Sequence, residues 1–129
     1  MGIEQNKDVV VRFTRLIEQG DVDGALALTS EDCTFWHPLS GETGKVQTGA
    51  VMKQMLPAMS AFRSEISSVT AEDDRVSLEV EVHATAPGGK PYHNRYHFMY
   101  VVRDGKIMAS REYLDTAPVL QAFSQERIS

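Results

Sequence analysis

The sequence contains a single cysteine, Cys33, among its 129 residues. One thiol excludes an intramolecular disulfide and a cysteine-rich metal site, and it is compatible with a reducing compartment. Basic residues are fewer than acidic ones, and the net charge of -5 argues against nucleic acid or an anionic membrane as a general partner. No apolar run approaches the roughly 18 residues of a membrane span. The opening residues lack the basic and then apolar layout of a signal peptide, so we expect a cytoplasmic protein.

Familiar catalytic and nucleotide-binding motifs are also missing. The sequence has no GxGxxG turn, no Walker loop, no GxSxG nucleophile elbow and no HExxH motif. His93 and His97 would lie on one face of a strand about 13 Å apart, too far for two ligands of one ion. We therefore expect a structural or solvated role for these histidines, and neither a specific metal site nor a cofactor.

The chain does have enough apolar content for one core. With 42% hydrophobic residues, a chain of this length fits a single domain over residues 1–129 that buries roughly two-thirds of its unfolded surface. No linker, repeat or low-complexity segment interrupts it.

Hydrophobic periodicity predicts helices early in the chain and strands later. Helices are expected over residues 6–19, after Asp21, from Thr48 or Gly49 to a kink or end at Pro57, and after Thr116. Strands are expected over residues 33–38, 64–72, 75–86 and in a hairpin over 92–115, and residues 125–129 should be frayed. This order is an α+β plan, in which four strands form an antiparallel meander and helices cover one face of a curved sheet.

The hairpin around Asp-Gly leaves two registers open. A two-residue turn at 104–105 would place Glu112 opposite His97, whereas a three-residue loop at 103–105 would place it opposite Tyr96. We favour the three-residue loop, because it gathers the aromatic side chains on one face together with a carboxylate and an amide. That face would hold Tyr92, Asn94, Tyr96, Phe98, Tyr100, Met108, Ser110, Glu112 and Leu114.

Glu112 is the best candidate for chemistry in this sequence. A carboxyl group that faces an apolar cavity has a raised pKa, which suits proton transfer near neutral pH. Tyr92, Asn94 and Tyr96 share its predicted face. The alternative is that Glu112 forms a surface ion pair with an arginine such as Arg95.

Two further groups are open to either a site role or a structural one. The polar positions of the preceding strand, Glu79, Glu81 and His83, could join the site, or they could face solvent or a subunit interface while the alternating valines face the core. The methionines of the third helix could fill gaps in the core or form an adaptable wall for a ligand.

The arrangement YxNxYxF, then DGKI, then REYLDT, after a helical N-terminal half, resembles the nuclear transport factor 2-like superfamily. Within it the likeness is to the SnoaL-like and ketosteroid-isomerase-related branch, and it covers nearly the whole chain. The resemblance implies a cone of curved antiparallel sheet around N-terminal helices, an internal pocket, and frequent dimerisation through the outer sheet face. It also implies that Glu112 holds the position of an acidic residue that moves protons in limonene epoxide hydrolase and phenazine-biosynthesis proteins. By the same similarity, Glu79 and Glu81 fall where that hydrolase keeps an inward Arg and Asp.

The sequence therefore favours a cofactor-independent acid-base enzyme, of isomerase, cyclase or hydrolase type, acting on a small and largely apolar molecule. Glu112 would transfer the proton, with Glu79 and Glu81 as further catalytic candidates, and Asn94 and Tyr96 would hold a polar group of the ligand. The other predicted binding residues are Tyr92, His83, Trp36, Phe98, Met52, Met55 and Leu114. The competing interpretation is a non-catalytic ligand-binding or dimeric interaction domain.

A homodimer is expected from the second face of the hairpin. This face would carry apolar side chains that a monomer would leave exposed, which usually marks an interface. They are Val101, Ile107, Ala109 and Tyr113.

Overall fold

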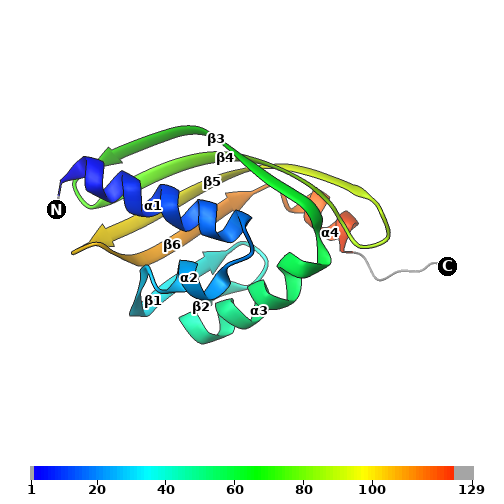
Figure 1. The fold of residues 1–129 in the computed structure, drawn as a ribbon, viewed down its shortest axis with the longest axis horizontal. Coiled ribbons are helices and arrows are strands. Elements are labelled where there is room, and N and C mark those ends of the chain that lie inside the picture. The colour runs from blue at the N-terminus through cyan, green and yellow to red at the C-terminus, as the bar shows by residue number, and fades with distance from the viewer. Residues whose placement is uncertain (1, 124–129) are drawn as a thin grey trace.

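The computed structural model describes residues 2–123 and confirms the α+β plan (Figure 1). The helices are α1 (Ile3–Glu18), α2 (Val22–Leu26), α3 (Lys45–Ala58) and α4 (Thr116–Ala122). The strands are β1 (Thr29–His37), β2 (Gly41–Thr43), β3 (Ser60–Glu72), β4 (Arg75–Thr85), β5 (Pro91–Arg103) and β6 (Lys106–Leu114). The expected fraying of residues 125–129 lies outside the described part of the chain.

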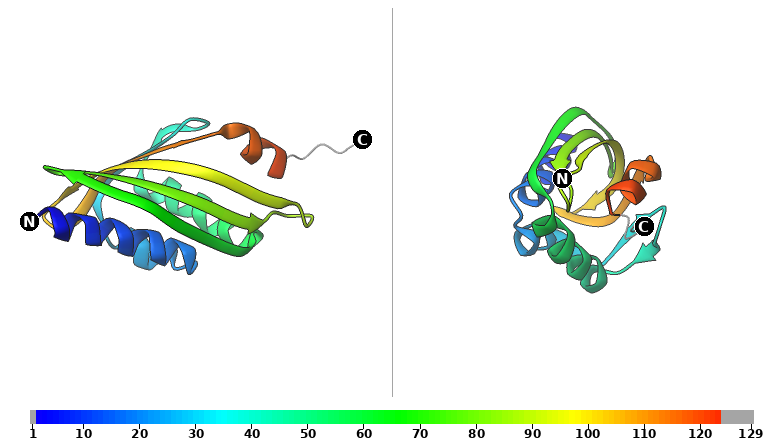
Figure 2. Two further views of the ribbon diagram at one scale, coloured as in Figure 1. Left: turned by 90° about the horizontal axis from the view of Figure 1, so that it is seen from above. Right: turned by 90° about the vertical axis from the view of Figure 1, so that its right-hand side faces the viewer.

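All six strands belong to one curved sheet, in the order β2-β1-β6-β5-β4-β3. The strands from β3 to β6 form the predicted antiparallel meander, and β1 adds to its edge parallel to β6. β2, only three residues long, was not among the predicted strands; Gly41, with a φ of 72°, lets the chain turn back onto β1. The sheet curls around the helices without closing (Figure 2).

The β5–β6 turn differs from the register that we favoured. Arg103 pairs with Lys106 across a two-residue turn at Asp104 and Gly105, whose positive φ values of 52° and 76° are typical of a type I′ hairpin. The three-residue loop is therefore wrong. The ladder then shifts by one residue at Met108, as in a β-bulge.

This bulge decides which side chains face inward. After it, Glu112 lies opposite Phe98, so it keeps the predicted face although its partner is not Tyr96. Before it, Ile107 pairs with Val102 and is fully buried in the core. Ile107 is therefore not part of an outer patch, contrary to our expectation, because the bulge reverses the alternation of side chains between Ile107 and Ala109.

Helix α1 lies across the concave face of the sheet and supplies much of the core (Figures 1 and 2). Val10 is fully buried, and the ring of Phe13 packs edge-on against Tyr100 with centroids 6.0 Å apart. At the end of the helix, Glu18 accepts a hydrogen bond from the backbone N–H of Ser64 at 2.7 Å. Arg15 donates to Glu18 at 2.8 Å and to the Ser64 carbonyl at 2.9 Å, so α1 is clamped to β3.

Helix α3 begins earlier than predicted, at Lys45, and includes Pro57 in its last turn. Gly49 faces α2, where an added Cβ would come within 2.8 Å of Leu26 Cδ1, so a glycine permits this close helix contact. Among the described helices, none is long and apolar enough to cross a membrane.

Candidate active site

A cavity of about 310 Å³ lies between the concave face of the sheet and helices α3 and α4. Its volume is at the small end of the range of about 300–1,000 Å³ that is usual for ligand pockets. Helix α3 contributes Met52 and Met55, the sheet contributes Val80 and Phe98, and α4 contributes Val119. The wall is mainly apolar, so a compact ligand with few polar groups would fit it best.

Glu112 is the carboxyl group in this cavity. It is 28% exposed by side-chain surface, and since it lines the cavity, that surface belongs to the pocket rather than to the outside of the molecule. Burial raises the pKa of Glu112 to about 7, because the charged form has lost most of its water. In the described structure no arginine or lysine lies within ion-pair distance of it. The alternative of a surface pair with Arg95 is thus not found.

His37, at the end of β1, is a titratable neighbour of Glu112 in the cavity. Its Nε2 lies 3.7 Å from Glu112 Oε2, and burial lowers the pKa of the imidazole. The backbone N–H of Leu39 donates to His37 Nδ1 at 3.1 Å. Because Nδ1 accepts this bond, the neutral ring carries its proton on Nε2, facing the carboxyl group. Sequence reasoning missed His37, since its position depends on the pairing of β1 with the distant β6.

Two tyrosine hydroxyls lie side by side in the same cavity. The oxygens of Tyr92 and Tyr96 are 2.5 Å apart, and Asn94 Nδ2 donates to Tyr92 at 3.0 Å. Either hydroxyl can be the donor of the bond between them, and when Tyr92 donates to Tyr96, the Tyr96 proton is free for a ligand. Burial raises the pKa of both phenols, so both stay neutral hydrogen-bond donors at physiological pH.

Asn94 supports this pair instead of facing the ligand. Its amide also donates to the Asp115 carbonyl at 2.9 Å, and its Oδ1 accepts from the backbone N–H of Arg95. The side chain is buried and is not among the cavity-lining residues. We therefore correct its expected role from ligand contact to positioning of Tyr92.

The other predicted site residues divide between the two faces of the sheet. Those at the cavity are Trp36, Met52, Met55, Tyr92, Tyr96 and Phe98, whereas Leu114 is not among its lining residues. Glu79, Glu81 and His83 lie on the outer face, because Val80 and Val82, which alternate with them on β4, face inward and are 3% and 5% exposed. The expectation that these three polar residues join the site of Glu112 is wrong.

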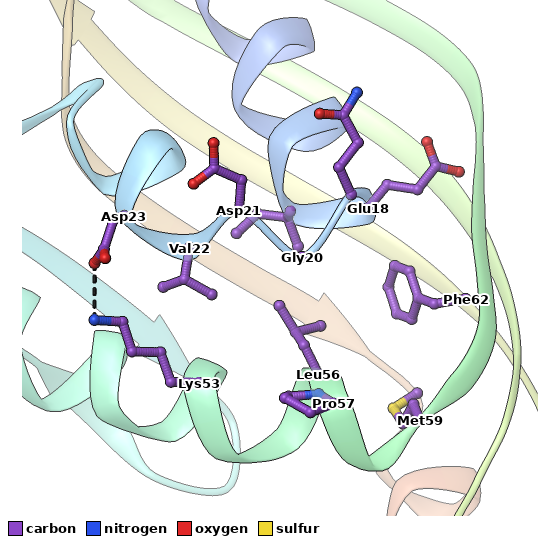
Figure 3. Close-up of a pocket in the computed structure, with 12 residues that line it drawn as sticks. Glu18, Gly20, Asp21, Val22, Asp23, Lys53, Leu56, Pro57, Met59 and Phe62 are labelled. Atoms are coloured by element: carbon purple, nitrogen blue, oxygen red, sulfur yellow. Dashed lines mark ion pairs between the residues drawn. The ribbon is translucent and has the colours of Figure 1, made fainter.

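A second hollow, of about 440 Å³, adjoins the cavity between the α1–α2 turn and α3 (Figure 3). An ion pair between Asp23 and Lys53, 2.8 Å long, spans its rim. Its other acidic groups have partners as well: Glu18 belongs to the clamp on Ser64, and Asp21 caps α2. This hollow therefore lacks an available proton-transfer group, and the cavity around Glu112 is the better candidate site.

Comparisons with known proteins agree with this architecture. A model of the SnoaL-like domain matches residues 10–110. AclR from Streptomyces galilaeus, a proposed hydroxylase, is 20% identical with a TM-score of 0.84, and the match covers 98% of this chain and all of that one. A proposed polyketide cyclase from Xanthomonas campestris is 21% identical with a TM-score of 0.79, covering 94% and 98% of the two chains. No curated protein sequence matches significantly.

The curved, unclosed sheet around helices is the nuclear transport factor 2-like fold. An NTF2-like protein of unknown function from Cytophaga hutchinsonii has the same fold, with a TM-score of 0.73, 21% identity, and coverage of 89% of this chain and 94% of that one. Since the domain model spans most of its length, the chain belongs to the SnoaL-like domain family.

Proposed function

We propose that this protein is a cofactor-independent enzyme that moves a proton on a small, largely apolar molecule held in the cavity. The observation that carries the proposal is Glu112, a carboxyl group with a pKa of about 7 in an apolar cavity. Near neutral pH such a group is divided between its two forms, so it can both take and return a proton. The names of AclR and of the Xanthomonas protein point to chemistry on small organic molecules, which supports this proposal.

The residues suggest a sequence of two proton transfers. Ionised Glu112 removes a proton from a carbon next to a carbonyl group, and the electron pair of that C–H bond moves onto the carbonyl oxygen. Tyr96 donates a hydrogen bond to this oxygen as its negative charge develops. Protonated Glu112 then returns the proton to another carbon or to the oxygen, which completes an isomerisation or prepares a ring closure. His37 borders the cavity beside the carboxyl group and shields that side from water.

The proposal can be tested with 5-nitrobenzisoxazole, a small apolar probe. Removal of its one acidic C–H proton by a base breaks the N–O bond and releases a coloured cyanophenolate. We expect catalysis that rises with pH and reaches a plateau above about 7, as Glu112 ionises. Glu112→Gln should lower the rate about 100-fold or more, the usual contribution of a positioned base.

The control is Glu79→Gln, which makes the same chemical change on the outer face of the sheet. It should leave the rate unchanged. Equal rates in wild type and Glu112→Gln, or no dependence on pH between about 5 and 8, would refute the proposed role of Glu112.

A binding protein without turnover is the second candidate. It is favoured by the hydrogen bonds that are already filled around the cavity: Tyr92 and Tyr96 bond to each other, and Asn94, which supports Tyr92 from outside the cavity lining, has its own hydrogen bonds filled. Binding of the probe to wild type and Glu112→Gln with equal affinity, together with no turnover by either, would favour this candidate over the enzyme.

We also propose that the protein is a homodimer that associates through the outer face of β5 and β6. Tyr113 is 45% exposed on this face, and its ring packs against that of Trp36 at a tilt of 37°, with centroids 5.3 Å apart. Val101 and Ala109 are paired across the same two strands and are only partly buried. Exposed aromatic and apolar surface of this kind is typical of an interface.

A further inference from the structure

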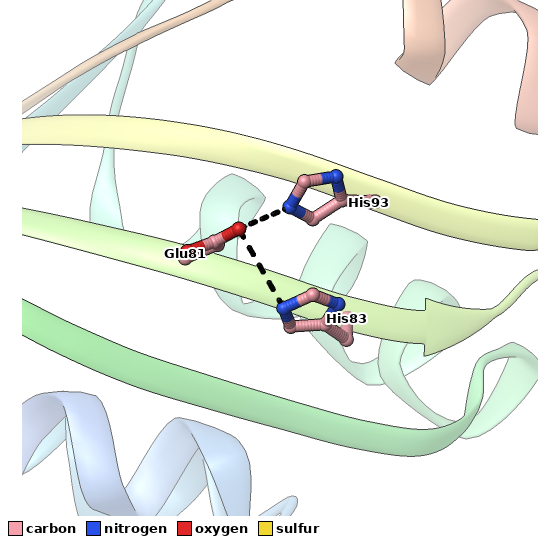
Figure 4. Close-up of side chains that lie close together, drawn as sticks. All are labelled: Glu81, His83 and His93. Carbon is pink, nitrogen blue, oxygen red and sulfur yellow. Dashed lines mark hydrogen bonds and ion pairs between the residues drawn. The ribbon is translucent and has the colours of Figure 1, made fainter.

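Three potential metal ligands meet on the outer face of the sheet, on the side away from the cavity (Figure 4). Glu81 and His83 are two residues apart on β4, so their side chains lie on the same face. His93 on β5 is the direct cross-strand partner of His83. The β4–β5 register therefore assembles two imidazoles and one carboxylate from positions that are distant in sequence.

The ligand atoms of these three side chains converge. His93 Nε2 is hydrogen-bonded to Glu81 Oε2, and His83 Nε2 lies 3.8 Å from the same oxygen. All three ligand atoms lie within 4.8 Å of one another. The two imidazole rings are stacked, with centroids 4.5 Å apart and an interplanar angle of 17°. Both Nε2 atoms point toward the carboxylate of Glu81 (Figure 4).

Contrary to our expectation from the sequence that the protein has no specific metal site, we propose that Glu81, His83 and His93 bind one divalent transition-metal ion of the zinc type. Two imidazoles and one carboxylate are a usual set of protein ligands for zinc, which also accepts water as a fourth ligand. Ligands at about 2.0–2.1 Å from one tetrahedral ion are about 3.3 Å apart. Because each imidazole lone pair lies in the plane of its ring, binding requires the two rings to rotate out of their present stack until both Nε2 atoms point at the ion. The three side chains are 27% to 53% exposed, so an ion and its water can reach them.

The charged residues around the cluster determine how strongly the local charge favours a bound cation. Glu65 Oε1 lies 3.8 Å from His83 Nε2 and adds negative charge that favours a cation. Arg95 Nε lies 4.0 Å from Glu81 Oε2, and its positive charge disfavours a bound cation. The Arg95 side chain is 82% exposed, however, and can turn into solvent. Arg63 pairs with His83 across β3 and β4 and is also exposed. The carboxylates of Glu81 and Glu65 thus offset the two arginines.

The consequence of binding would be a crosslink between two central strands. An ion held by His83 and His93 joins β4 to β5 directly behind Val82 and Tyr92, which line the cavity on the other face. Since the unfolded chain does not hold the three ligands together, zinc should raise the stability of the folded protein.

The site can be tested by titrating the full-length protein with zinc chloride in a calorimeter at about pH 7.5, where most imidazoles are neutral. We expect one ion per chain and a higher thermal unfolding midpoint with zinc. His83→Ala and His93→Ala should each weaken zinc binding about 100-fold or more, because loss of a mere outer-shell partner already costs about 10–100-fold.

His97→Ala is the matched control. His97 is also an exposed histidine on the outer face of β5, but it hydrogen-bonds to Ser77 and is not part of the cluster. This variant should bind zinc as the wild type does. Absence of binding by the wild type, equal affinity in His93→Ala, or one ion shared by two chains would each overturn the proposal.

Discussion

Glu112 and His37 are held in the cavity as a pair that is poorly solvated. Their nearest atoms are 3.7 Å apart, beyond a normal hydrogen bond, and burial disfavours the charged form of each. Just below pH 7 a large fraction of Glu112 is therefore neutral, and the neutral form of His37 is favoured as well. A ligand that accepts a hydrogen bond from one of these groups would not first have to break a strong hydrogen bond between them.

This arrangement makes a prediction for stability. The pKa of Glu112 rises from about 4.3 in the unfolded chain to about 7 in the folded protein, so ionisation costs stability as pH rises through this window. Glu112→Gln removes the cost, and its stability relative to wild type should increase by up to about 3 kcal/mol between pH 4.3 and 7 and then stay level. Urea unfolding of both proteins at a series of pH values measures this difference.

If the stability of the wild type instead increased relative to that of Glu112→Gln as pH rises, Glu112 would be a paired structural charge. That result would contradict the proposed proton-transfer role as well, since a paired carboxylate stays ionised. Glu79→Gln again controls for the change of charge.

At the residue scale, the sequence predicted the face of Glu112 but not its neighbours. Alternation of aromatic residues in the hairpin was sufficient to place Glu112 with Tyr96 and Tyr92, because strand side chains alternate between faces. His37 could not be predicted beside it, since nothing local specifies a parallel pairing between β1 and β6. The grouping of His83 with His93 could have been found by counting outward from Gly88 in the loop between β4 and β5.

The elements depend on a few specific contacts, and the clamp between α1 and β3 is the clearest of them. Burial alone would raise the pKa of Glu18, but the Ser64 N–H and Arg15 together lower it. The interaction therefore stabilises the fold above the unfolded pKa of about 4.3 and is lost as pH falls through the lower folded value.

Glu18→Gln should destabilise the protein by about 1–3 kcal/mol at neutral pH, the usual value of a hydrogen bond to a charged group. The difference in stability between the variant and wild type should shrink below pH 4. Urea unfolding of both proteins at neutral pH and below pH 4 would show this. Glu4→Gln is the control, since Glu4 is exposed and, among the residues described, forms an ion pair only with Lys7 on its own helix, at 3.5 Å. An equal loss in both variants would show that the clamp contributes nothing specific.

Prediction of the elements failed where tertiary contacts decided the outcome. The β5–β6 hairpin was identified from Asp-Gly, but its bulge at Met108 has no sequence signal that we could read, and it moved Ile107 into the core. β2 was too short to show any periodicity. By contrast, the clean alternation of β4 predicted both its extent and its buried valines.

For the whole molecule, the proposed dimer makes a direct prediction. Light scattering at micromolar concentration should give about twice the chain mass of 14.4 kDa. Tyr113→Glu should shift the protein to monomer, because it places a charge in the centre of the proposed interface. Val46→Glu changes a residue that is 89% exposed on α3, and it should leave the dimer intact. A monomer mass for the wild type would rule the interface out.

The parallel pairing of β1 with β6 has a consequence for how the protein is made. β1 is translated early, but the strand that completes its ladder lies near the C-terminal end of the described chain. Until β6 leaves the ribosome, β1 cannot form its parallel ladder with β6. The thiol of Cys33, which is 1% exposed in the folded protein, is not yet buried by that ladder. His37 and Glu112 meet only through this late pairing. The candidate active site can therefore form only after β6 has been synthesised.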